Sequence, residues 1–201
     1  MALGSKKNII VGAASVFLAD QDIALPAAVA GTGFGTTLDT DADWENVGYT
    51  QDGLEVATDP SFGEVEVDQL LDAAKIFKDG MGLSISTTFA EATLKNLMIA
   101  WGQQADSLVE GSTSTLTIEG GSLGEAPYER QLAAVGNGPE LDTSNEYKER
   151  TYHAYRVLSV EGSSHSLARA DATVIPVTFR ALPDDDGKYG IVRDREIGTA
   201  V

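Results

Sequence analysis

The sequence predicts a mainly β protein: an antiparallel β-sandwich or barrel-like domain with one flanking α-helix and long loop or terminal arms. Runs rich in β-branched and aromatic residues recur along the chain between clusters of Gly, Pro, Asn and Asp. Only one segment has helical periodicity, and no βα unit repeats. With 201 residues, 42% of them hydrophobic and 22% charged, the chain has a globular composition. We predict one domain over residues 1–201.

The N-terminal part begins with a predicted strand over residues 9–18. Residues 19–43 follow, a connection rich in Ala, Gly, Thr and Asp that is too long for a simple turn. We predict a long loop or arm there, mobile by itself because its apolar residues are irregularly spaced. The next strand, residues 47–58, is expected to end at Asp59-Pro60 because proline lacks an amide donor.

Strict alternation of apolar and acidic residues marks the next strand, residues 63–68. Side chains of a strand alternate between its faces, so Val65 and Val67 are expected on a dry face. The opposite face would carry the carboxylates of Glu64, Glu66 and Asp68. Residues 83–87 alternate in the same way, and we predict them as the antiparallel partner in a broad hairpin.

The one predicted helix follows. Thr88-Phe-Ala-Glu91 matches a capping box, and Gly102 is a typical stop. Four apolar residues then fall at helical spacing and are expected to form the core face of the helix against a sheet: Leu94, Leu97, Met98 and Trp101.

Strands are predicted to continue to the end of the chain. Between them, residues 136–145 have the composition of a turn and loop, and residues 183–201 are predicted as a C-terminal tail. The predicted strands are residues 114–119, 128–135, 151–161 and 172–182.

The charge distribution is uneven. The chain has 31 acidic and 14 basic residues, a formal net charge of −17. Residues 8–74 contain thirteen carboxylates and no Lys, Arg or His. This excludes broad adhesion to nucleic-acid phosphates or anionic lipid. The acidity indicates either a well-solvated surface that maintains solubility or one face of the fold that must stay negative.

The residues for most kinds of catalysis are missing. The chain has no cysteine and only two histidines, His153 and His165, which excludes thiolate sites and multi-histidine metal centres. Residues 39–43 begin like a calcium loop, but Trp44 and Thr50 stand where glycine and glutamate belong. We predict no catalytic residues, cofactor or metal, and therefore no enzyme. No apolar run approaches the roughly twenty residues of a membrane-spanning helix.

Several segments, taken in order, resemble the major tail tube proteins of long-tailed bacteriophages, such as those of siphophages. The resemblance spans about residues 44–192, and no single segment is diagnostic. The matching segments are residues 44–54 (WENVGYTQDGL), 59–60 (DP), 64–69 (EVEVDQ), 84–97 (SISTTFAEATLKNL), 151–157 (TYHAYRV), 175–184 (IPVTFRALPD) and 189–190 (YG).

The resemblance implies a structural virion protein that self-assembles into stacked hexameric rings and forms the tail tube. It implies contacts with a tape-measure protein and with the terminator and distal tail proteins at the tube ends. The protein would be part of the virion tail after assembly in the host cytoplasm, with no membrane partner. DNA would pass through the tube without specific binding.

An acidic lining suits such a channel because basic contacts to DNA phosphates would add affinity at every ring. We therefore predict that Glu64, Glu66 and Asp68 face the lumen, the alternative being an exterior solvated strand. A second function class also fits the residues: a soluble acidic β-sandwich that serves as a binding or adhesion module.

Overall fold

The computed structural model describes residues 8–29, 32–140 and 147–197 of the chain. This part is mainly β and antiparallel, with two α-helices rather than the single helix predicted. The helical elements are α1 (Phe34–Asp39), α2 (Leu94–Ala100) and the 3-10 helix η2 (Ala105–Ser107). The strands are β1 (Ser15–Asp20), β2 (Glu45–Asn46), β3 (Thr50–Val65), β4 (Lys75–Phe89), β5 (Leu108–Val109), β6 (Thr115–Leu116), β7 (Arg130–Glu140), β8 (Tyr147–Ser159), β9 (Ile175–Ala181) and β10 (Gly190–Glu196).

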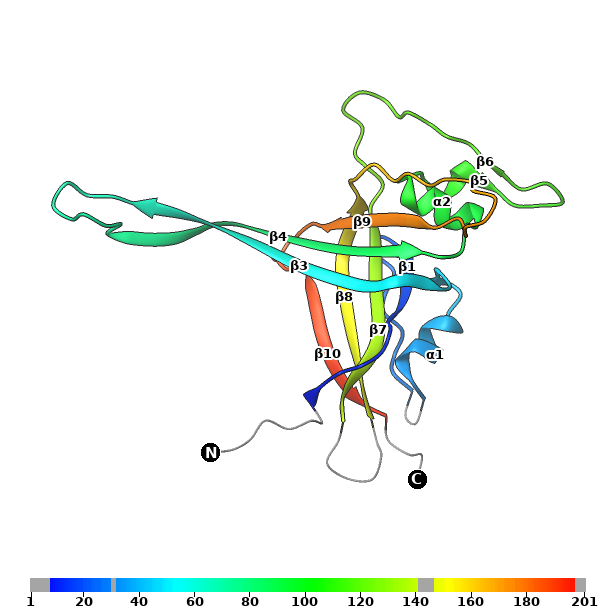
Figure 1. Ribbon diagram of the computed structural model, residues 1–201, viewed down its shortest axis with the longest axis horizontal. Helices are drawn as coiled ribbons and strands as arrows, with labels where there is room; N and C mark the ends of the chain where they lie inside the picture. Colours follow the sequence, from blue (N-terminus) through cyan, green and yellow to red (C-terminus); the bar gives the residue numbers. More distant parts are fainter. Residues whose placement is uncertain (1–7, 30–31, 141–146, 198–201) are drawn as a thin grey trace.

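Eight strands form one sheet, in which β8 is the branching strand. The order is β2-β1-β7-β8-β9-β4-β3, and β10 also pairs with β8. Lys148–Ala154 of β8 pair with β10, whereas Val157–Ser159 pair with β9. Figure 1 shows β3, β4 and β9 crossing the direction of β7, β8 and β10, so the two halves of the sheet pack in a sandwich-like arrangement.

The main core lies between these halves and under α2. Its largest fully buried side chains include Phe89, Phe179, Leu132 and Ile99. A second cluster lies on the other face of β1 and β7, where Phe17 and Trp44 meet the buried side chains of α1. Residues 16–19 of strand β1 are buried on both faces of the sheet, so this run is continuously apolar rather than alternating.

The predicted loop or arm at residues 19–43 is packed onto this second cluster. It contains α1, whose Phe34 and Leu38 are buried, and Ile23 and Leu25 pack beside them. The helix has six residues, too few to show a helical period in the sequence. Its irregularly spaced apolar residues nevertheless meet on one face of the sheet.

Strand β3 runs through Asp59-Pro60 instead of ending there. Proline is tolerated because β3 lies at the edge of the sheet, where one side of the strand needs no ladder hydrogen bonds. The turn signal at residues 51–53 is a bulge in the strand, with Asp52 at φ 65° and Gly53 at φ 80°. Residues 83–87 pair with residues 54–58 and not with residues 63–68.

Other boundaries also differ from the predictions. Helix α2 begins after Thr93, whose side chain accepts a hydrogen bond from Asn96 N at 3.1 Å, while Thr88 belongs to β4. Gly102, at φ 63°, follows the end of α2 as predicted. The first strand begins at Ser15 rather than at residue 9. The C-terminal tail contains β10, and β7 extends to Glu140, within the predicted loop 136–145.

Candidate assembly interface

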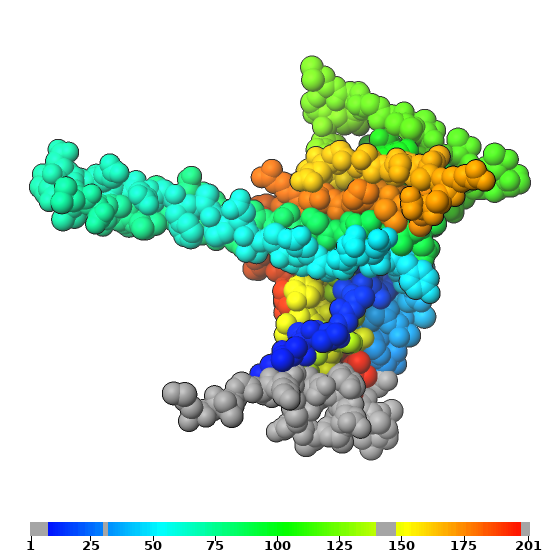
Figure 2. Space-filling model, viewed as in Figure 1, coloured from blue at the N-terminus to red at the C-terminus, as the bar shows by residue number. Residues whose placement is uncertain are grey.

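Strands β3 and β4 continue beyond the sheet as a two-stranded projection. Strand β4 pairs with β9 over Leu83–Phe89, but its pairing with β3 continues outward to Lys75 opposite Val65. We name residues 59–82 the arm; from here on the word refers to this segment and not to residues 19–43. Figures 1 and 2 show it standing out from the rest of the molecule. Among the described residues, no third strand pairs with it. An isolated two-stranded hairpin is marginally stable in water, so the arm is expected to need a partner.

Large apolar side chains cover the arm without a core behind them. At the turn, Leu71 is fully exposed and Leu70 is 60% exposed. The other exposed apolar side chains of the arm are Phe62, Val65, Val67, Ile76, Phe77 and Met81. Several exposed large apolar side chains on one projecting element are typical of a protein–protein interaction site.

Both faces of the arm mix apolar and charged residues. Glu64 lies directly opposite Ile76, and Phe62 is on the same face as both. Val65 and Phe77 are on the other face. The predicted division into a dry face and an anionic face is therefore not seen in one chain, because the strand has no core layer on either side.

The three carboxylates predicted to line the lumen lie at the outer end of the arm. Glu64 is in β3, Glu66 and Asp68 are in the turn that follows, and all three are exposed. Val65 and Val67, predicted to pack inward, are 42% and 38% exposed. The arm as a whole carries six carboxylates and two lysines. The assignment of Glu64, Glu66 and Asp68 to a lumen stays a prediction.

Apolar surface continues from the arm onto the body. The hydroxyl of Tyr189 donates to Met81 O at 2.6 Å and fixes the arm at its root. Beside this bond lies a cavity of about 350 Å³ with an apolar lining that includes Val56, Leu83 and Val192. The root of the arm thus offers an apolar groove next to an exposed apolar projection.

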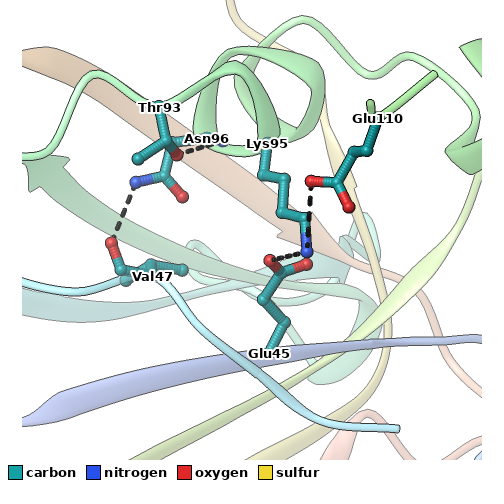
Figure 3. A network of polar contacts seen from close by, with 6 residues as sticks. All are labelled: Glu45, Val47, Thr93, Lys95, Asn96 and Glu110. Carbon is teal, nitrogen blue, oxygen red and sulfur yellow. Dashed lines mark hydrogen bonds and ion pairs between the residues drawn. The ribbon is translucent and has the colours of Figure 1, made fainter. Parts of the chain in front are cut away.

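Helix α2 positions the start of β3 through polar contacts (Figure 3). Asn96 Nδ2 donates to Val47 O at 2.9 Å and to Glu91 O at 2.8 Å. Glu91 Oε1 in turn accepts from Tyr49 N at 2.9 Å. Because Val47 and Tyr49 lie just before the first residue of β3, these bonds set the direction in which that strand leaves the body.

Lys95 ties the same helix to two neighbouring segments. Its ammonium lies 3.0 Å from Glu45 of β2 and 3.7 Å from Glu110, which follows β5 (Figure 3). The hydrogen bond and charge of Glu45 raise the pKa of Lys95 above its usual value. The pair is partly exposed, so it contributes to orientation more than to stability.

The residues predicted as the core face of the helix have unequal burial. Met98 is buried, and Leu97 and Trp101 are partly buried against the main core. Leu94, at the first position of α2, is 37% exposed. Ile99 and Ala100 are buried as well. The late start of the helix places Leu94 at its exposed end.

The histidines have separate structural environments. His153 is buried beside Trp44, with ring centroids 5.9 Å apart, and His165 stacks on Trp101 at 6.0 Å. Within the described residues, no three Asp, Glu or His side chains are grouped so as to hold a metal ion. The helices of the described ranges lack the length and apolarity to cross a bilayer.

A family model described as "Phage tail tube protein" matches residues 1–192 of the chain. No curated protein matches it.

Proposed function

The chain belongs to the phage tail tube protein family, and from this premise we propose that it self-assembles into stacked hexameric rings that form the tail tube. Family membership makes it a structural component of the virion tail that associates with itself, and not an enzyme. This favours the tube over a soluble binding or adhesion module. We further propose that residues 1–201 act as one tail tube domain.

The exposed apolar side chains and unpaired edges of the arm support the proposal for this chain. Its apolar side chains have no core to join in their own subunit, and both of its edges are unpaired within the described residues. Contact with a second copy would bury the apolar side chains and satisfy the edge groups. The arm is thus the element proposed to join subunits.

The channel proposal rests on charge. An acidic inner surface repels DNA phosphates, so DNA would pass at low friction during ejection into the host. Glu64, Glu66 and Asp68 are the proposed lumen residues, since they lie on a projecting element in the stretch that lacks bases. A tape-measure protein inside the tube, terminator and distal tail proteins at its ends, and assembly in the host cytoplasm are parts of the same proposal.

An arm-shortened variant tests self-assembly. Ser61 pairs with Gly80, so Asn-Gly in place of residues 62–79 would close the hairpin with a two-residue turn. The main and second core clusters contain no residue of the removed segment, so the subunit should still fold. Wild-type protein at high concentration should form tubes in negative stain, while the folded variant should remain dispersed. Tubes formed equally by both proteins would remove the arm from the assembly mechanism.

A further inference from the structure

A partly open cavity lies beside the second core cluster. Its volume is about 550 Å³, and it is lined by strand β10, strand β8, the start of α1 and residues 25–28. We name the segment Ile23–Val29, which contains residues 25–28, the strap. Its lining includes Leu25, Phe34, His153, Ile191, Arg193 and Arg195. Apolar walls with a few polar groups are typical of a ligand site.

The strap is fixed over the cavity at both ends. Gln131 Nε2 donates to Ile23 O at 2.7 Å, and Trp44 Nε1 donates to Ala24 O at 3.4 Å. At the other end, Arg195 Nη2 donates to Val29 O. These bonds hold the strap in place beside the cavity.

Hydrogen bonding fixes the tautomer of His153, which is 7% exposed. Because Gln131 Nε2 donates to the strap, Gln131 Oε1 is the acceptor for His153 Nε2 at 2.9 Å. The proton is thus on Nε2, and Nδ1 is an acceptor. Nδ1 is buried and has no hydrogen-bond partner in the described part of the chain.

The arginines that line the cavity, Arg193 and Arg195, retain charge and hydrogen-bonding capacity that could serve a ligand. Arg195 Nη1 is buried and likewise has no partner in the part that the structure describes. Arg193 is close enough for its charge to lower the pKa of His153, after the larger effect of burial. The lining carboxylate, Asp194, is already held by Arg150 at 2.6 and 2.7 Å. A buried acceptor and a buried cationic donor therefore remain unsatisfied in a strongly acidic protein.

We propose that this cavity binds a small oxyanion that also carries a hydroxyl group, of which hydrogen phosphate is the simplest. The anionic oxygens would accept from Arg195 Nη1 and pair with Arg193, and the hydroxyl would donate to His153 Nδ1. A DNA phosphodiester has no hydroxyl on its phosphate, so the cavity discriminates against the DNA backbone. The proposal does not depend on tube formation.

Inorganic phosphate tests the site at pH 7 on dilute, unassembled protein. Phosphate should raise the melting temperature, and calorimetry should show it binding roughly 3- to 10-fold more tightly than sulfate, the value of one hydrogen bond. Sodium chloride at equal ionic strength should leave the melting temperature unchanged. Equal effects of phosphate, sulfate and chloride would overturn the proposal.

Matched variants locate the binding. His153→Phe should remove the preference for phosphate over sulfate, and Arg193→Gln should weaken both ions. Arg193 is exposed, so its variant gives an answer even if His153→Phe does not fold. Arg180→Gln, an exposed control on β9, should bind as wild type does. Loss of phosphate binding in Arg180→Gln, or unchanged phosphate binding in Arg193→Gln, would contradict the assignment of the site to this cavity.

Measuring phosphate binding by assembled tubes shows whether the natural oxyanion is a free ion or a group of a neighbouring copy. If tubes still bind phosphate, the natural ligand is a free ion. If binding is lost only in tubes, a neighbouring copy supplies the same chemistry from a hydroxyl and a carboxylate side chain. Either result requires phosphate binding by the unassembled chain.

Discussion

Replacing both Leu70 and Leu71 by serine should raise the protein concentration at which tubes form by at least about 50-fold. Both residues lie at the turn of the arm, and Leu71 is fully exposed in the single chain. Burying a fully exposed leucine contributes about 1.5–3 kcal/mol. Because Leu70 is only 60% exposed, the two leucines together contribute about 2.4–4.8 kcal/mol per subunit. At 1.4 kcal/mol per factor of ten, that energy corresponds to roughly 50- to 3,000-fold.

Sedimentation over a concentration series measures this threshold directly. Leu167→Ser is the matched control, because Leu167 is 86% exposed but lies in the connection between β8 and β9. We expect its threshold to stay near that of wild type. Neither variant should change the melting temperature of the unassembled subunit. An unchanged threshold in the double variant, or the same increase in the control, would refute a role of the arm turn in assembly.

Three further predictions concern the subunit itself. Leu38→Ala should lower the free energy of unfolding by about 2–5 kcal/mol in a urea titration, because Leu38 is fully buried; a loss below about 1 kcal/mol would show that α1 is dispensable. Ile99→Ala should cost more than Leu94→Ala in the same assay, since Ile99 is 2% and Leu94 37% exposed, and the reverse order would contradict the packing of α2. Burial, with the charge of Arg193, lowers the pKa of His153 from 6.5 to about 4. The unfolded chain then binds a proton that the folded chain does not, so stability should fall by up to about 3 kcal/mol as the pH drops from 6.5 to 4. His153→Phe should be less pH-sensitive over that range, and identical slopes would exclude the effect.

The sequence predicts the fold class because the dominant signals are local. Strand runs around residues 128–135, 151–161 and 172–182 correspond to β7, β8 and β9, with boundaries shifted by a few residues. The amphipathic segment near Leu97 is a helix, and its stop at Gly102 agrees with the structure. Each of these features depends on residues close together in the chain.

The errors come from interactions between distant segments. Helix α1 is too short for its period to be read, and it is stable because Phe34 and Leu38 pack on β1 and β7. The pairing register of β3 and β4 cannot be predicted from local sequence either, since the alternation in residues 63–68 and 83–87 fits many pairings. Residues 69–80 have a composition typical of turns, so the sequence does not predict that the hairpin projects as the arm. Its adjacent apolar pairs, Leu70-Leu71 and Ile76-Phe77, are the signal that indicates exposed apolar surface there.

Cryo-electron microscopy of tubes assembled from the wild-type protein would show whether the arm joins the subunits. We expect the arm of each subunit to lie against a neighbouring copy, with Leu70 and Leu71 buried in that contact. We also expect the carboxylates of Glu64, Glu66 and Asp68 to face the channel. Tubes in which the arms project into solvent, or in which these carboxylates lie on the outer wall, would contradict these expectations.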